Sequence, residues 1–294
     1  MELWVALAIG AAFLQNLRSA LQKALTPRVG VVGASYARFL FAAPWAVALV
    51  AVLALREGAV PVPTAVFAGW AAAGALTQIS GTLLLLHLFS LRNFAVGNTF
   101  ARTETVQAAV FGFVLLGDRL APLATVGVVV GLVGLVLLSA TRGIGGGALN
   151  RAAAIGLASG ASFALSAVAY RAASLALAET DGFLLRPAFT LAVVTVLQTL
   201  LISLWFFFRD PRRIASVLRA WQVAGPVGLS GMLASLGWFA AFTLATAAQV
   251  KAVGQVELLF SWLTARYAFG ERPSGRETAG IALVAAGIVL VILG

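Results

Sequence analysis

The sequence predicts an all-α, polytopic membrane protein whose ten transmembrane helices form two inverted five-helix repeats. Of its 294 residues, 61% are hydrophobic and 10% are charged, whereas soluble domains carry about 25% charged residues. The apolar runs are continuous, as in residues 121–140 and 187–208, which hold no charge. A membrane-spanning helix needs about 20 such residues, and barrel strands would alternate apolar with polar residues. An internal repeat is the third observation.

Prolines, glycines and charged residues bound ten expected spans. We expect the spans at residues 3–24, 33–55, 65–90, 95–116, 121–141, 152–177, 185–208, 221–246, 251–269 and 276–293. Residues 3–17 have no basic segment before them and no clear small-residue cleavage site after them. We therefore expect the first run to be a span and not a removed signal peptide.

The repeat divides the chain into residues 1–143, a glycine-rich linker at 144–150, and residues 151–294. An offset of 153 residues aligns Glu104 with Glu257, and Gly117-Asp118-Arg119 with Gly270-Glu271-Arg272. Eight identities fall within the 35 positions from 104 to 138. Apolar bias alone would not align a glutamate and a Gly-acid-Arg turn at one offset. Because each half has an odd number of spans, the second half should enter the membrane from the opposite side.

A glutamate, twelve mostly apolar residues, a Gly-acid-Arg turn and a glycine-spaced helix occur twice. This pattern resembles the EamA branch of the drug/metabolite transporter superfamily, as does Arg38-Phe39 near the start of the second span. Thr105 and Leu258 stand where that family often has proline. The resemblance covers the whole chain in span number and length, and it implies a secondary transporter.

Several other functions are disfavoured by the composition. The formal net charge is +10, but the basic residues lie singly or in short loops, where they are expected to meet lipid headgroups and not nucleic acid. The chain has no cysteine and one histidine, and it lacks a P-loop and a Ser/His/Asp arrangement. We therefore expect no enzyme activity, no cofactor and no metal site.

The ionisable residues inside the spans are the first candidates for function, because burying a charge in the bilayer is expensive. Glu104 and Glu257 lie about 20 Å of helix from their Gly-acid-Arg turns. One interpretation is a carboxyl group that binds a proton or a cationic substrate, since burial favours the protonated form. The other is a carboxylate that accepts hydrogen bonds from a neighbouring helix and holds the fold.

A second set consists of arginines, which would suit a carboxylate or phosphate on the substrate. Arg18, Arg38 and Arg102 are its main members, while Arg171 and Arg186 could instead reach the headgroups. His87 could shuttle protons or pack in an apolar run. Further candidates to line a substrate path are the polar and aromatic residues Gln15, Asn16, Gln78, Asn98, Tyr170, Trp238 and Trp262. Hydrogen bonding between helices is the default role of amides such as Gln107, Gln198, Gln249 and Gln255.

These features lead to one main functional hypothesis. The expected protein is an inner-membrane exporter of a small polar metabolite, such as an amino acid or organic anion, working by alternating access with or without proton coupling. A multidrug or organic-cation transporter of the same fold is the alternative, and a membrane-embedded enzyme or lipid-handling scaffold is disfavoured by the short loops. Expected partners are a small-molecule substrate, membrane lipids and protons, in a monomer or homodimer that binds no nucleic acid.

Two further features leave alternatives open. Five Lys and Arg residues fall on the side of the termini and eleven on the other side. Because basic loops tend to stay in the cytoplasm, this count predicts that both termini lie outside it. The family resemblance instead favours termini inside. The Gly127-x3-Gly131 spacing should permit close helix approach, between subunits or between halves.

Overall fold

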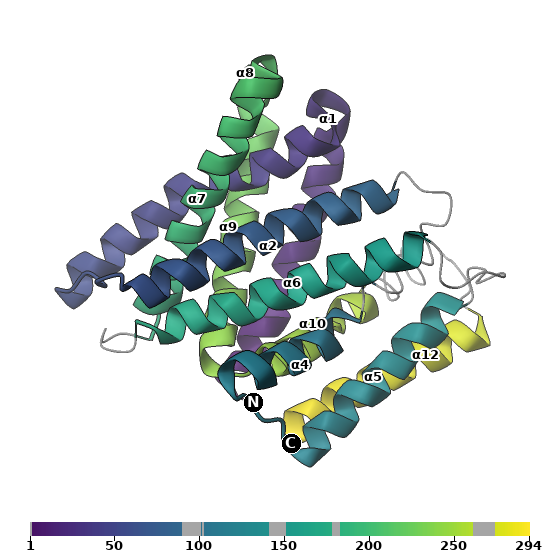
Figure 1. Cartoon of the computed structure of the whole chain (residues 1–294). Helices are drawn as coiled ribbons and strands as arrows, with labels where there is room; N and C mark the ends of the chain where they lie inside the picture. Colours follow the sequence, from purple (N-terminus) through teal and green to yellow (C-terminus); the bar gives the residue numbers. More distant parts are fainter. Residues whose placement is uncertain (1, 90–100, 102, 141–150, 178–182, 261–273) are drawn as a thin grey trace. The chain divides into compact units, whose positions relative to one another are not determined.

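The computed structural model describes the chain except residues 1, 90–100, 102, 141–150, 178–182 and 261–273 (Figure 1). The described residues form helices and no strands. In chain order the helices are α1 (Leu3–Glu57), α2 (Ala65–Phe89), α4 (Glu104–Leu116), α5 (Pro122–Ala140), α6 (Arg151–Leu175), α7 (Leu185–Arg209), α8 (Pro211–Arg219), α9 (Trp221–Leu244), α10 (Ala247–Gly254) and α12 (Gly275–Leu293).

Six of the predicted spans correspond closely to single helices, namely α2, α5, α6, α7, α9 and α12. Four helices of the described part are long and apolar enough to cross a membrane, over Leu3–Gln22, Ala24–Glu57, Leu185–Arg209 and Trp221–Leu244. The ten spans and the inverted repeat of the whole chain therefore stay predictions.

The first two predicted spans, 3–24 and 33–55, are joined by a kink. Both spans lie in the 55-residue helix α1, which is kinked and not interrupted by a loop. Pro27 cannot donate a backbone hydrogen bond, and Gly30 leaves the helical conformation with φ 74° and ψ 168°. Glycine tolerates this positive φ because it has no Cβ. The chain can thus change direction within a few residues.

Three other boundaries differ from the prediction. The basic stretch after α7, expected as a loop, forms the short helix α8, with Pro211 in its first turn. Helix α10 begins at Ala247, four residues before the expected start at 251, because Thr246 and Gln249 form a reciprocal capping box. Helix α4 begins at Glu104, and most of the expected start of that span lies outside the described residues.

The contacts divide the chain into two compact units, each drawn from both halves of the sequence. The first unit contains Met1–Ile9, Thr77–Val168 and Leu244–Gly294, and the second contains Gly10–Leu76 and Ala169–Thr243. The units therefore do not follow the order of the sequence repeats.

In the first unit, α5 and α12 pack side by side through glycines (Figure 1). A Cβ on Gly127 would lie 2.7 Å from the Gly287 carbonyl oxygen, and a Cβ on Gly134 would lie 2.7 Å from that of Gly280. The two helices are therefore antiparallel. In the sequence repeat Gly127 corresponds to Gly280 and Gly134 to Gly287, so each glycine contacts the counterpart of the other. The close approach predicted for Gly127 thus joins the two halves of one chain.

In the second unit, a buried cluster fills the space around the α1 kink. It comprises Leu25, Val29, Ala34, Tyr36, Ala37, Phe206, Val217, Ala224 and Val227. Tyr36 packs edge-on against Phe206, with ring centroids 5.3 Å apart, and its hydroxyl lies 2.6 Å from Ser203 Oγ. Residues from α1, α7, α8 and α9 thus share one core.

Candidate functional site

The second unit brings two of the predicted arginines to one point on α9. A Cβ on Gly231 would lie 3.3 Å from Arg18 Cδ and 3.4 Å from Arg38 Cγ. The aliphatic stems of both arginines, which come from α1, therefore lie against the bare backbone of Gly231. A larger residue there would have to displace one of the stems.

The surroundings of Arg38 are aromatic and neutral. Its guanidinium carbon lies 5.0 Å from the centroid of the Phe39 ring, and the group interacts electrostatically with the Tyr170 hydroxyl. Glu57 and Asp210 are the two carboxylates among the described residues of this unit. Glu57 is exposed at the end of α1, and Asp210 pairs with Arg213 at 3.1 Å. Among the described residues of this unit, neither carboxylate is therefore placed to neutralise Arg38.

Tyr170 is held rigidly near this positive charge. The ring is buried, with 2% of its surface exposed, and stacks on Phe239 at a centroid distance of 4.3 Å. Its hydroxyl donates to the Gly74 carbonyl oxygen at 2.9 Å and accepts from Gln198 Nε2 at 3.4 Å. Gln198 Nε2 also lies 3.5 Å from the Ala75 carbonyl oxygen. Both polar groups are therefore fixed by neighbouring helices.

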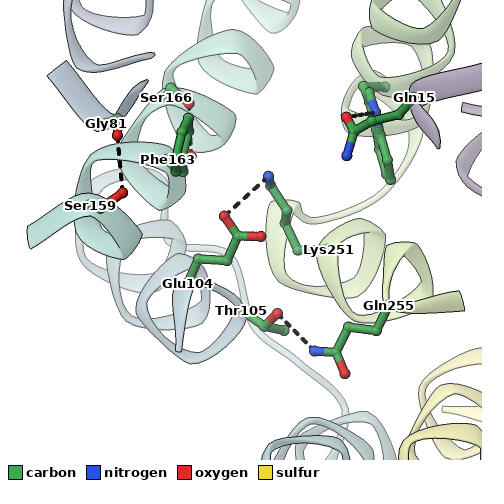
Figure 2. A network of polar contacts seen from close by, with 10 residues as sticks. Gln15, Gly81, Glu104, Thr105, Ser159, Phe163, Ser166, Lys251 and Gln255 are labelled. Carbon is green, nitrogen blue, oxygen red and sulfur yellow. Dashed lines mark hydrogen bonds and ion pairs between the residues drawn. The ribbon is translucent and has the colours of Figure 1, made fainter. Parts of the chain in front are cut away.

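A second polar contact lies along the same two helices. Trp238 Nε1 donates to Gln15 Oε1 at 3.1 Å, and Figure 2 shows the Gln15 side chain in this contact. Trp238 follows Gly231 by seven residues on α9, and Gln15 precedes Arg18 by three on α1, so each pair occupies one helix face. Five predicted residues, Gln15, Arg18, Arg38, Tyr170 and Trp238, thus fall in one region. We call these five residues the arginine cluster.

The first unit contains a separate polar network between α4 and α10 (Figure 2). Glu104 Oε2 lies 3.5 Å from Lys251 Nζ, with about a quarter of each side chain exposed, 24% and 22% respectively. One turn away, Gln255 Nε2 donates to Thr105 Oγ1 at 3.1 Å. This geometry favours the interpretation in which Glu104 holds two helices together.

The second half of the chain, residues 151–293, matches the EamA-like transporter family. This match agrees with the resemblance drawn from the repeated glutamate and Gly-acid-Arg motif. Together with the apolar helices, it indicates a multi-pass membrane protein.

Solved structures share the fold of this chain. Matches extend to 28 chains, and one crystal structure aligns with a TM-score of 0.68 over 99% of this chain and 96% of its own, at 20% sequence identity. At that identity the likeness concerns the fold alone. No curated protein matches the sequence.

The remaining predicted residues of the EamA-like protein are dispersed. Glu257 is half-buried just after α10, Gln78 is half-buried in α2, Asn16 is half-buried beside Gln15, and His87 is exposed in the last turn of α2. Asn98, Arg102 and Trp262 lie outside the described residues.

The arginines at the ends of α6 and α7 behave differently from each other. Arg171 donates to the Phe242 carbonyl oxygen at 2.8 Å, so it joins two helices. Arg186 is half-buried in the first turn of α7, and its buried Nε makes no hydrogen bond.

Lys251 is not among the predicted site residues, because it stands at the very start of an expected span, 251–269, where a basic residue would meet the headgroups. The signal that could have predicted its position is the spacing of Lys251 and Gln255, which are four residues apart. Residues at this spacing share one face of a helix, and here both contact α4. The amides Gln198 and Gln255 form hydrogen bonds between helices, and Gln107 bonds both Thr103 and the Leu157 carbonyl oxygen of α6. Gln249 instead caps its own helix.

Proposed function

We propose that this EamA-like protein is a secondary transporter for a small metabolite carrying a carboxylate or another anionic group. The observation that carries the proposal is the convergence of Arg18 and Arg38 on Gly231, with Arg38 beside neutral and aromatic neighbours. A charge that lies among neutral groups inside a membrane protein is costly without a counter-ion. A substrate anion would supply a negative charge to Arg38 each time it binds.

The chemistry of the arginine cluster suits this role. A guanidinium offers several donors in a fixed plane and binds a carboxylate through two parallel hydrogen bonds. The Tyr170 hydroxyl and the Trp238 ring lie on neighbouring elements and could orient the remainder of the substrate. An amino acid or a small organic acid combines the required anion with a short polar or apolar body.

The direction and energy source of transport belong to the same proposal. We propose export across the inner membrane, with alternating access between two states of the helices. Glu104 lies 3.5 Å from Lys251 between α4 and α10, so a role for Glu104 in proton coupling would require the two side chains to separate. We therefore assign Glu104 mainly to structure.

The test is ligand binding by the purified full-length chain, followed by uptake in proteoliposomes. Amino acids, organic acids, sugars and quaternary amines would be screened by thermal stabilisation, since a bound ligand stabilises the folded state. The proposal expects stabilisation by one class of anionic metabolite. Arg38→Gln should weaken that binding about 10- to 100-fold, the loss expected for a charge-assisted hydrogen bond.

Two variants serve as controls for this test. Arg38→Lys keeps the charge but loses the planar pair of donors, so it should bind more weakly than the wild type and more tightly than Arg38→Gln. Arg56→Gln changes an exposed arginine at the other end of α1 and should bind like the wild type. Unchanged affinity in Arg38→Gln would contradict the proposal.

A transporter of organic cations is the second candidate. The stacked pairs Tyr170–Phe239 and Trp238–Phe242 favour it, because aromatic faces attract cations. The charges of Arg18 and Arg38 oppose it by repulsion. Stabilisation by quaternary amines, unchanged in Arg38→Gln, would decide for this alternative.

A further inference from the structure

Helix α8 (Pro211–Arg219) joins the two membrane-spanning helices α7 and α9, and its two faces differ sharply. Val217 is fully buried and Ile214 packs against the same core around the α1 kink. Arg212 and Arg219 are exposed, as is Arg209 at the end of α7. The helix therefore lies with one apolar face on the protein and a basic face directed away from it.

Arg213 has a different role from the other three arginines. Its Nε donates to Asp210 Oδ2 at 3.1 Å, and one terminal nitrogen donates to the Val29 carbonyl oxygen at 3.0 Å. Val29 directly precedes the kinked residue Gly30, where the regular helical hydrogen bonding of α1 is interrupted. Arg213 thus binds α8 to the kink. It also pairs with Asp210, which is the one carboxylate in the sequence between Arg209 and Arg219.

Aromatic side chains mark the depth of α8 in the bilayer. At the end of α7, Trp205, Phe207 and Phe208 have 50%, 63% and 75% of their surfaces exposed. At the start of α9, Trp221 is 61% exposed. Exposed aromatic rings gather where the hydrocarbon core meets the headgroups, so the basic residues between these rings lie at headgroup level.

We propose that α8 is an interfacial helix that binds the headgroups of anionic phospholipids through Arg209, Arg212 and Arg219. The guanidinium groups of these three arginines are exposed, and Asp210, the carboxylate beside them, is already paired with Arg213. Their positive charges therefore complement the negative charge of lipid phosphates. The flanking rings provide apolar contacts for the acyl chains, which a free phosphate ion lacks. The occupant is therefore a lipid and not a soluble anion, and the inference does not depend on the substrate proposed for the arginine cluster.

Lipid binding at this place should stabilise the folded chain. The lipid would hold α8 at the interface, and α8 holds the α1 kink through Arg213 and the Val217 core. A ligand that binds only this folded arrangement raises the stability of the whole protein.

The experiment measures the melting temperature of the purified full-length chain in neutral detergent with added phosphatidylglycerol, phosphatidylcholine or inorganic phosphate. Phosphatidylglycerol should raise the melting temperature, while phosphatidylcholine and phosphate should not. The triple variant Arg209→Gln, Arg212→Gln, Arg219→Gln should lose most of that rise. A control triple variant at three exposed arginines elsewhere, Arg56→Gln, Arg119→Gln and Arg276→Gln, should keep it.

An equal rise with phosphatidylcholine or with phosphate would overturn the proposal, and so would a full rise in the α8 triple variant. A second measurement uses the wild type alone and does not depend on whether the variants fold. The rise with phosphatidylglycerol should shrink as salt increases, because salt screens charges at exposed sites. A rise that is independent of salt would also overturn the proposal.

Discussion

The polar residues of this chain divide into those with a partner in the fold and those that face neutral surroundings. Glu104 and Lys251 neutralise each other between α4 and α10, and Gln255 and Thr105 add a hydrogen bond to the same helix pair. Arg38 instead lies 5.0 Å from the centroid of the Phe39 ring, within electrostatic range of Tyr170. A pair of opposite charges inside a membrane protein supports the fold, whereas a charge beside neutral groups suits a ligand.

A double-mutant cycle tests the assignment of Glu104 to structure. Glu104→Gln and Lys251→Gln should each lower stability, and their combination should cost less than the sum, by a coupling energy of about 0.5–1 kcal/mol for a partly exposed pair. Chemical or thermal unfolding in detergent would measure this. Transport by Glu104→Gln should continue. Loss of transport with unchanged stability would show instead that Glu104 takes part in coupling.

Tyr170 offers a test of how rigidly the arginine cluster is held. Tyr170→Phe keeps the stacking on Phe239 but removes the hydrogen bonds to Gly74 and from Gln198. Both partners are buried, so the loss should cost about 1–3 kcal/mol of unfolding free energy. Thr125→Val, at an exposed hydroxyl on α5, is the control and should change stability little. Equal stability of Tyr170→Phe and the wild type would contradict the described network.

Among the helices, close packing depends on glycine at a few defined positions. At Gly127 and Gly134 the backbone of α5 contacts the backbone of α12 directly. Added volume at such a contact cannot be absorbed by a side-chain rotation, because the obstructing atoms belong to the main chain. Glycines elsewhere, such as Gly69 in α2, meet no atom within 4 Å of an added Cβ.

Alanine substitutions separate these two kinds of glycine. Gly127→Ala and Gly134→Ala should each destabilise the chain by about 1–3 kcal/mol, the usual cost of overpacking. The control Gly69→Ala should stabilise it by about 0.5–1 kcal/mol, because alanine favours a helix more than glycine does. Melting temperatures of the three variants provide the measurement. A neutral Gly127→Ala would mean that α5 and α12 are further apart than described.

For the whole molecule, the residue counts and the family resemblance predict opposite orientations of the chain in the membrane. The loop that contains α8 carries the densest set of arginines. Short loops rich in Lys and Arg remain in the cytoplasm, and the proposed lipid site needs the anionic surface that this side provides. The residue counts thus predict that α8 is cytoplasmic and that Arg56, at the end of α1, lies outside.

The absence of cysteine from the sequence makes this orientation easy to measure. A single introduced thiol is the only target for a membrane-impermeant thiol reagent. Arg56→Cys should react in intact cells, whereas Arg212→Cys should react only after the membrane is permeabilised. Both positions are exposed, so accessibility within the protein is matched. The reverse labelling pattern would place the termini inside, as the family resemblance implies.

The sequence by itself determined the all-helical membrane class, most helix positions and the family. The helical class depends on local composition, such as the charge-free run of α5. The family depends on a repeat that is visible in the order of the residues, such as the alignment of Glu104 with Glu257. Only the tertiary structure decided which residues meet. It paired Glu104 with Lys251, brought the stems of Arg18 and Arg38 together at Gly231, and joined the first two spans through the kink at Gly30. Such contacts join residues far apart in the chain, and their formation depends on how helices pack and not on local preference.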